Sequence, residues 1–322
     1  MPKRVIIDCD TGIDDAIALL LCFRHLDVVG ITTVAGNVAL ANTQRNTRYV
    51  TELAGRQDIP VYAGCDRPLL VPLETAAAVH GAGGLGDIEI PQPTKQLEEL
   101  HAVDYLIRTY ADSVNRDITL VTIGPLTNVA VALLREPRLA EWIPEIVCMG
   151  GSLTYGNHTP AAEFNVYADP EAAKVVFEAG IPLRMVGLNL TRQNAMTAQD
   201  VETLRDMGNA PAAFAARLLD YVVRQDGRGC LCDACAVMWL IEPSVIMKSL
   251  PLHVVVETKG EFTRGMTLCD YRHLIGSDAA RDIEHVPQYT AHGAPPNVTV
   301  ALEMDLAAFN KVLFDTMNSY TQ

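Results

Sequence analysis

A chain of 322 residues, 49% of them hydrophobic, is long and apolar enough to bury a large core. Its formal net charge of -14 at pH 7 argues against a nucleic-acid partner, because proteins that bind the phosphate backbone need a basic surface. No apolar run reaches membrane-spanning length, and the first strand begins too early to leave room for a signal peptide. The eight cysteines are irregularly spaced, as is typical of free thiols in a reducing compartment. We therefore expect a cytoplasmic globular protein without a nucleic-acid or membrane partner.

Short β-branched runs alternate with longer helical patterns along the first 190 residues. Strands are predicted at residues 5–8, 28–36, 59–64, 118–124, 145–151 and 183–188, and helices from about residue 14 and over 42–55, 101–114, 126–136 and 170–180. This alternation predicts an α/β fold with an open, mostly parallel, Rossmann-like central sheet flanked by helices.

The later part of the chain has a different pattern. We expect a helical hairpin over residues 198–241, near the active site, and exposed or antiparallel strands at 253–260 and 297–305. Because no linker, repeat or change of composition divides the chain, residues 1–322 are expected to form a single domain. In open α/β sheets, sites form outside the carboxyl ends of the strands, so the strand-end loops are where chemistry is expected.

Four aspartates, Asp8, Asp10, Asp14 and Asp15, stand where the first strand gives way to the first helix. Asp8 and Asp10 are expected to share one face of the sheet, Gly12 permits a tight turn, and Asp14 or Asp15 opens the helix. One aspartate would suffice as a helix cap. Four packed carboxylates raise one another's pKa unless a cation or a shared proton neutralises them, which indicates a metal site or acid–base chemistry. All-oxygen donors without nearby His or Cys favour calcium or magnesium over zinc.

The stretch DCDTG, residues 8–12, is similar to the DxDxT pattern of haloacid-dehalogenase-like phosphatases. In that interpretation Asp8 is the nucleophile and magnesium the metal. The pattern is short, it leaves Asp14 and Asp15 without a role, and no later acidic pair completes the magnesium site.

A second resemblance accounts for more of the chain. DCDTGIDDA, residues 8–16, closely resembles the DxDxGxDDA signature of the inosine-uridine preferring nucleoside hydrolases. The resemblance continues in order through ITTVAGN, VHGAGGLG, GPLTNVA, MGGS, GNHTPAAEFNVYADPEAA and CDACAV. It implies hydrolysis of the N-ribosidic bond of ribonucleosides to ribose and free base, with calcium at the floor of the pocket, by a homodimer or homotetramer.

The resemblance also implies roles for individual residues. Calcium would be held by Asp10, Asp15, Asp233 and the backbone carbonyl of Ile123, and Asp10 would act as general base toward the attacking water. The substrate-binding residues that it implies are Asp14, Asn37, His80, Met149, Asn157, Glu163 and Asn165. Glu163 and Asn165 are expected to point the same way from an extended loop, and His80 to lie on a mobile flap.

Cys232 stands where many members of that family have a histidine, directly before the last metal-binding aspartate, positioned to protonate the departing base. A thiol can donate a proton, but it is shorter and a weaker hydrogen bonder than imidazole. A subgroup of the family carries cysteine here, which argues against a dead enzyme. A nucleoside- or ribose-binding protein that has lost turnover at Cys232 is a third interpretation, and the retention of Asp10 counts against it. Zinc held by Cys230, Cys232 and Cys235 is disfavoured because no second ligand pair accompanies them.

The base is expected to contact the flap and residues 221–228, where no motif distinguishes purine from pyrimidine.

Overall fold

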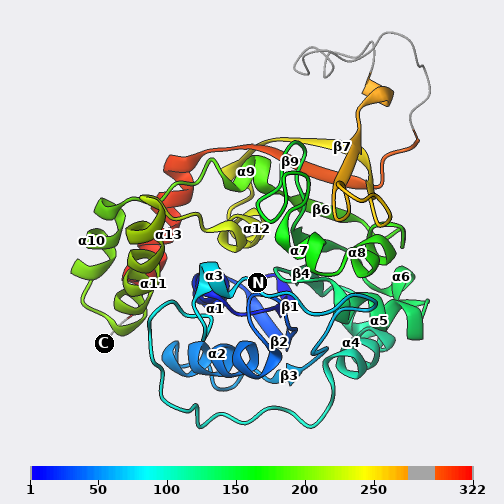
Figure 1. Cartoon of the computed structure of the whole chain (residues 1–322). Coiled ribbons are helices and arrows are strands. Elements are labelled where there is room, and N and C mark those ends of the chain that lie inside the picture. Colours follow the sequence, from blue (N-terminus) through cyan, green and yellow to red (C-terminus); the bar gives the residue numbers. More distant parts are fainter. Residues whose placement is uncertain (1, 275–293, 321–322) are drawn as a thin grey trace.

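Over residues 2–274 and 294–320, which the computed structural model describes, nine strands form one sheet in the order β3-β2-β1-β4-β5-β6-β9-β7-β8 (Figure 1). Their bounds are β1 (Arg4–Cys9), β2 (Asp27–Thr33), β3 (Val61–Ala63), β4 (Thr119–Thr122), β5 (Ile146–Met149), β6 (Leu183–Val186), β7 (Ile246–Val256), β8 (Thr267–Asp270) and β9 (Val298–Met304). The seven strands from β3 to β9 in this order run parallel, and β7 is antiparallel to both of its neighbours. The predicted open, mostly parallel sheet is confirmed.

Helices cover both faces of the sheet, and alternate residues of each strand supply the two cores. In β1, Val5 and Ile7 face one core while Ile6 faces the other. The first core is covered by α1 (Ile13–His25), α2 (Leu40–Leu53), α10 (Ala198–Asp206), α11 (Ala210–Asp226), α12 (Cys232–Ile241) and α13 (Leu306–Asn318). The second is covered by α4 (Ala102–Ala111), α5 (Thr127–Arg135), α6 (Leu139–Trp142) and α8 (Pro170–Phe177).

Short helices occupy several of the loops. These are α3 (Ala77–His80), α7 (Phe164–Ala168) and α9 (Leu188–Thr191), together with the 3-10 turns η1 (Ser113–Asn115), η2 (Pro243–Val245) and η3 (Arg272–Leu274). Helix α7 lies in the connection after β5, and α9 comes directly after β6. Both short helices therefore lie at the edge of the sheet where the parallel strands have their carboxyl ends.

The strand order creates a switch point between β1 and β4. From β1 the chain moves outward through β2 to β3, and it then returns to place β4 on the opposite side of β1. Ligands in open α/β sheets bind in the crevice outside the carboxyl ends of the strands at such a point. Asp10 directly follows β1 and Ile123 directly follows β4, so the fold brings these two positions to the crevice.

Three details of the later part of the chain differ from the prediction. Residues 198–241 form three helices rather than a hairpin, because α12 turns back to pack against α1 while α10 and α11 pack together at one end of the molecule (Figure 1). Strand β7 begins at Ile246, seven residues earlier than expected. Strand β9 is antiparallel to β7 but parallel to β6, and its buried side chains place it inside the sheet. The alternation of polar and apolar residues indicates which side chains of a strand are exposed to solvent. It does not indicate which strand lies beside it or in which direction that strand runs.

Two predictions concern features distributed over the chain. All eight cysteines are free thiols, as the irregular spacing indicated. Within the described ranges, no helix has both the length and the apolar composition needed to cross a membrane.

Candidate active site

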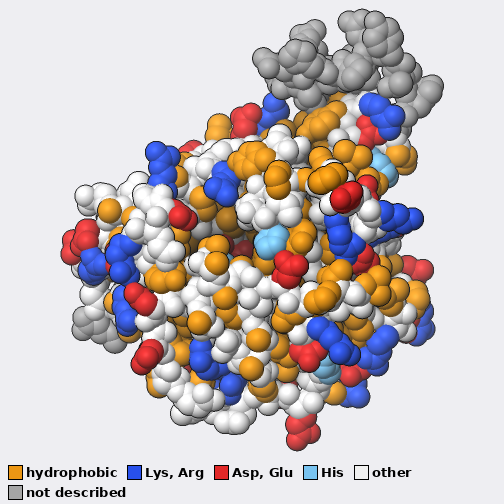
Figure 2. Space-filling model, viewed as in Figure 1, with side chains coloured by type: hydrophobic (Ala, Val, Ile, Leu, Met, Phe, Trp, Pro, Cys, Tyr) orange, Lys and Arg blue, Asp and Glu red, His pale blue; other side chains and the backbone are white. Residues whose placement is uncertain are grey.

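A cavity of about 680 Å³ opens beside the switch point, and Figure 2 shows it as a hollow on this face of the molecule. The predicted site residues that line it are Asp14, Asn37, His80, Ile123, Met149, Asn157, Glu163, Asn165, Cys232 and Asp233. Asp10 and Asp15 are fully buried and lie against this group. The structure therefore gathers all twelve predicted positions in one region, although they are spread over more than 220 residues of sequence.

Three aspartates form a compact group at the floor of the cavity. Asp14, Asp15 and Asp233 each place a carboxylate oxygen within 4.8 Å of the others. They meet because the N-terminal turns of α1 and α12 lie together where these two helices pack. Asp10 joins the group through its backbone N–H, which donates to Oδ1 of Asp15 at 3.2 Å. Asp14, which the sequence placed among the sugar-binding residues, thus lies within the same acidic cluster.

Asp15 is held by backbone and side-chain donors. Its Oδ2 accepts hydrogen bonds from the N–H of Gly12 and from Nδ2 of Asn37, both at 2.9 Å. The N–H of Ile13 donates to Nδ1 of His80 at 3.1 Å, which ties α3 to the start of α1. In this structure the predicted flap is therefore attached to the aspartate turn. The hydrogen bond also requires Nδ1 of His80 to be unprotonated, in accord with a pKa that burial lowers.

The cluster holds more negative charge than its surroundings neutralise. Burial, and after it the charge of Asp14, raises the pKa of Asp15 to about 7. Burial also raises the pKa values of Asp10 and Asp233 well above their usual range, and neighbouring carboxylates add to the effect. Oδ2 of Asp10 accepts the N–H of Asn37 at 2.7 Å, but its Oδ1 is buried without a partner among the described residues. An orphaned carboxylate oxygen inside an all-oxygen acidic cluster fits a hard divalent cation.

The backbone after β4 lies close to this cluster. A Cβ atom at Gly124 would come within 2.6 Å of Oδ1 of Asp10, so glycine permits the approach. The carbonyl of Ile123 accepts a hydrogen bond from Nδ2 of Asn165 at 3.2 Å, and the carbonyl of Met149 accepts a second from the same nitrogen at 3.2 Å. Since a carbonyl oxygen has two lone pairs, Ile123 keeps one for a further ligand.

The local structure at Glu163 differs from the prediction. The expected extended loop is wrong, because Glu163 caps the N-terminus of α7 and Asn165 lies in the first turn of that helix. The carboxylate of Glu163 accepts the N–H groups of Gly151, Asn165 and Val166 at 2.9, 2.9 and 3.1 Å. Burial raises the pKa of Glu163 to about 7, and these hydrogen bonds oppose the rise. Both side chains still line the cavity, and Oδ1 of the nearby Asn157 accepts the N–H of Phe164 at 2.9 Å.

The β7–β8 hairpin supports this wall from behind. Thr267 Oγ1 accepts the N–H of Ser152 at 2.8 Å and donates to the carbonyl of the same residue at 2.7 Å. Gly151, with φ of +71°, packs directly under Thr267, since an added Cβ would be 2.7 Å from its Cγ2. The turn that donates to Glu163 is thus clamped by a residue more than 100 positions later. No motif in the sequence indicates this contact.

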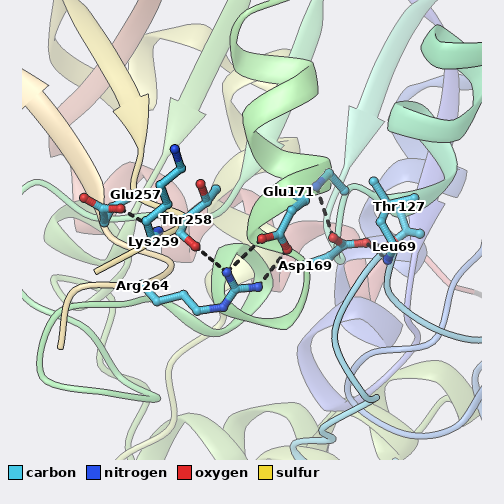
Figure 3. Close-up of polar contacts among 9 residues, drawn as sticks. Leu69, Thr127, Asp169, Glu171, Glu257, Thr258, Lys259 and Arg264 are labelled. Atoms are coloured by element: carbon cyan, nitrogen blue, oxygen red, sulfur yellow. Dashed lines mark hydrogen bonds and ion pairs between the residues drawn. The ribbon is translucent and has the colours of Figure 1, made fainter. Parts of the chain in front are cut away.

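An ion pair and a helix cap fix the surroundings of the hairpin (Figure 3). Arg264, in the loop between β7 and β8, forms two hydrogen bonds of 2.7 Å with the carboxylate of Glu171 on α8. Asp169 caps α8 and also accepts from the N–H of Leu69 at 2.9 Å and from Thr127 Oγ1 at 2.7 Å. The hairpin, α8 and the start of α5 are therefore joined by buried or half-buried polar contacts.

Asp8 does not belong to the site. It is fully buried and does not line the cavity, and its Oδ1 accepts hydrogen bonds from Oγ1 of Thr32 and from Nδ2 of Asn128. These partners tie β1 to β2 and to α5, which is a structural role. The phosphatase interpretation needs the Asp8 carboxylate to reach the cavity, but hydrogen bonds from Thr32 and Asn128 hold it between β2 and α5, so that interpretation is wrong.

The cysteines near residue 232 do not form a zinc site. Cys232 opens α12 and lines the cavity with Cys230, whereas Cys235 is fully buried within the helix beside Asn194. In the part of the chain that the structure describes, the aspartate group is the only set of three potential metal ligands.

Another part of the wall comes from residues for which the sequence indicated no individual role in the site. It includes Leu188, Arg192, Ala195, Val222, Asp226, Arg228 and Cys230. Three of these fall within the segment 221–228 that was expected to contact the base. Arg192 and Ala195 follow α9 in a stretch that carries no recognisable motif, so only the folded chain reveals them.

Comparison with known proteins identifies the family. The family model described as inosine-uridine preferring nucleoside hydrolase matches residues 5–311. The chain is 38% identical over 329 residues to the pyrimidine-specific ribonucleoside hydrolase RihA of Escherichia coli K12, covering 99% of this chain and 100% of that protein. The RihA of Salmonella paratyphi C is 39% identical with the same coverage.

Solved structures agree with the sequence relatives. The purine-preferring ribonucleoside hydrolase from Gardnerella vaginalis superposes with a TM-score of 0.87 at 29% identity, covering 99% of each chain. The plant nucleoside hydrolase PpNRh1 superposes with a TM-score of 0.85 at 32% identity, covering 99% of this chain and 100% of that one. The family match, the relatives and the architecture agree, and the chain belongs to the inosine-uridine preferring nucleoside hydrolase family of enzymes.

Proposed function

We propose that this chain hydrolyses the N-ribosidic bond of ribonucleosides to ribose and free base, in a calcium-dependent reaction with Asp10 as general base. The observation that carries the proposal is the buried aspartate cluster at the floor of a cavity whose wall presents amide and carboxylate groups suited to sugar hydroxyls. The relatives named as ribonucleoside hydrolases support the same reaction.

The residues that would hold the cation are Asp10, Asp15, Asp233 and the carbonyl of Ile123. Asp14 lies close enough to Asp15 and Asp233 to contribute an oxygen. The free Oδ1 of Asp10 and the raised pKa values of the cluster support this ligand set, because both are relieved by a positive charge. When bound, calcium would lower the pKa of a water in its coordination shell, which favours attack on the sugar at neutral pH.

Asp10 is arranged to take a proton. The N–H of Asn37 holds its Oδ2 at 2.7 Å, so the carboxylate is oriented while Oδ1 keeps its lone pairs for a water molecule. With a cation keeping the cluster ionised, the oriented Asp10 carboxylate would be free to take a proton from water.

The sugar would be held by Asp14, Asn157, Glu163 and Asn165. Because Glu163 and Asn165 are fixed by α7 and by the ends of β4 and β5, they offer pre-oriented acceptors and donors to ring hydroxyls. Carboxylates around the ring also stabilise the positive charge that develops as the glycosidic bond breaks. Asn37, His80 and Met149 would complete the wall, and Cys232 would face the leaving base.

The test is release of reducing sugar from purine and pyrimidine ribonucleosides, with and without a calcium chelator, beside a generic phosphate ester. Chelator-sensitive ribose release, restored by added calcium, is the expected result. No release from any nucleoside would overturn the proposal, and restoration by another divalent ion but not by calcium would overturn its metal assignment.

The family resemblance also leads us to expect a homodimer or homotetramer. Analytical ultracentrifugation of the purified chain measures this directly, and a monomer at micromolar concentration would contradict it.

A further inference from the structure

The cavity has two chemically different walls. One carries Asn157, Glu163 and Asn165, which come from α7 and the loop before it. The other carries Arg192 and Arg228, with Asp226, Cys230 and apolar side chains, from the region between α9 and α12. A nucleoside whose sugar lies among the amides and carboxylates therefore presents its base to the arginine wall.

A backbone bridge places both arginines on that wall. Arg192 directly follows α9, and Arg228 immediately precedes Gly229. The N–H of Gly229 donates to the carbonyl of Met196 at 2.9 Å, and the N–H of Met196 donates to the carbonyl of Gly229 at 2.7 Å. The segments after α9 and after α11 are thus joined, and their arginines share one face of the cavity.

Neither guanidinium is engaged by the protein. Among the described residues, Arg192 and Arg228 form no ion pair and no side-chain hydrogen bond, although both line a cavity rich in carboxylates. Arg224, four residues before Arg228, behaves differently, since it pairs with Asp87 at 3.0 Å and with Asp220 at 3.1 Å. Both arginines are exposed residues of the cavity lining, so their unpaired guanidinium groups are free to donate to a bound ligand.

The other donors on the cavity are neutral, occupied or weak. His80 accepts the N–H of Ile13 through Nδ1, which leaves it a neutral Nε2–H donor, and Nε2 of His158 lies 3.3 Å from the carboxylate of Glu74. The thiol of Cys232 is short and a weak hydrogen-bond donor. The two guanidinium groups are therefore the strongest donors available to a base on this wall.

We propose that Arg192 and Arg228 are catalytic residues that stabilise the negative charge on the departing base. The inference rests on the proposed hydrolysis. As the water oxygen bonds to C1′ and its proton passes to Asp10, the C1′–N bond breaks and its electron pair moves onto the base. In a base such as uracil this charge spreads to the carbonyl oxygens, which accept hydrogen bonds from the guanidinium groups. The base then takes up a proton from solvent, and Asp10 returns its proton to solvent.

These hydrogen bonds accelerate the reaction because they strengthen as charge develops in the transition state. Their contribution should depend on how much help the leaving group needs. Uracil leaves as a basic anion and needs stabilisation, whereas p-nitrophenolate is already a stable anion. The two leaving groups therefore separate stabilisation of the base from binding of the sugar.

The experiment measures kcat on uridine and on p-nitrophenyl β-D-ribofuranoside for Arg192→Gln, Arg228→Gln and the double variant, with calcium present. We expect the double variant to lose about tenfold to hundredfold in kcat on uridine, the size of a lost charge-assisted hydrogen bond, and to keep nearly the wild-type rate on the p-nitrophenyl substrate. Arg228→Lys, which keeps the charge but loses the planar fork, should lie between wild type and Arg228→Gln on uridine.

Arg224→Gln is the matched control, because Arg224 lies four residues before Arg228, near the end of α11, outside the cavity, and is paired. It should retain wild-type rates on both substrates. Equal losses on both substrates in the double variant, or an unchanged rate on uridine, would overturn the assignment of the arginines alone. A wild-type chain that cleaves neither substrate would overturn the proposed hydrolysis, and this inference with it.

Discussion

The aspartate cluster should make the metal-free protein less stable as the pH rises. The pKa of Asp15 is raised from 3.8 to about 7, so between these values the folded chain binds more protons than the unfolded chain. The free energy of unfolding therefore falls as the pH rises through this window. The contribution of Asp15 is complete only below the pKa that Asp15 has in the unfolded chain. From pH 5 to pH 7, two units at about 1.4 kcal/mol each give a loss of about 3 kcal/mol from Asp15 alone.

The loss is large enough to measure as a change in melting temperature. An unfolding entropy of about 2.1 cal/mol/K per residue gives about 0.7 kcal/mol/K for 322 residues. With a chelator present, the melting temperature should therefore be about 4 °C lower at pH 8 than at pH 5. Saturating calcium should remove most of this difference, because the ion binds the deprotonated, folded cluster. Differential scanning calorimetry measures the melting temperature under all four conditions, which are the two pH values with chelator and with calcium.

Asp233→Asn provides the internal comparison. The substitution removes a buried carboxyl whose own pKa is raised well above its usual range, and it keeps the shape of the side chain. The chelated variant should lose less stability between pH 5 and pH 8 than wild type, and calcium should no longer stabilise it. A wild-type melting temperature that falls equally with and without calcium would refute the argument, as would an identical pH response in Asp233→Asn.

Three further predictions concern activity. Asp10→Ala should lower kcat on ribonucleosides at least about a hundredfold while the far-ultraviolet circular dichroism stays native, and equal activity in the variant would contradict the role of Asp10 as base. Cys232→His should preserve or raise turnover on poor leaving groups in a nucleoside panel, whereas unchanged rates for every base would place residue 232 away from the base. Thr267→Val should raise KM, because it loosens the turn at Gly151 and Ser152 that donates to Glu163. Thr267→Ser, which keeps the hydroxyl, should restore KM. In a double-mutant cycle with Glu163→Gln the two effects should be non-additive, and additive effects would remove Thr267 from the positioning of the sugar wall.

The fold was predictable where one physical pattern dominates. Parallel strands buried on both faces read as continuous β-branched runs, and this pattern located β1, β2, β4, β5 and β6. The carboxyl ends of such strands meet at one edge of the sheet, so a site that includes the residues after β1 and β4 also followed from the pattern. The family resemblance supplied the more distant positions, such as Asp233.

Contacts between residues on elements far apart in the sequence could not be predicted, because they depend on how those elements pack. The place of Asp14 beside Asp233 depends on how α1 meets α12, and neither helix encodes that geometry locally. The capping role of Glu163 required knowledge that α7 begins there. The clamp by Thr267 and the bridge at Gly229 join segments whose local patterns carry no sign of their partners.

Asp15 and Asp233 are under different evolutionary constraints, because Asp15 also supports the fold. Asp15 accepts hydrogen bonds from the backbone of Gly12 and Asp10 and from Asn37, so the start of α1 depends on it even in a chain without activity. No nitrogen of the described residues donates to the carboxylate of Asp233, whose burial next to three other aspartates opposes folding. A duplicated copy of this gene released from selection for catalysis should therefore lose Asp233 before Asp15. In surveying such copies, the residue at position 233 is the better indicator of retained activity.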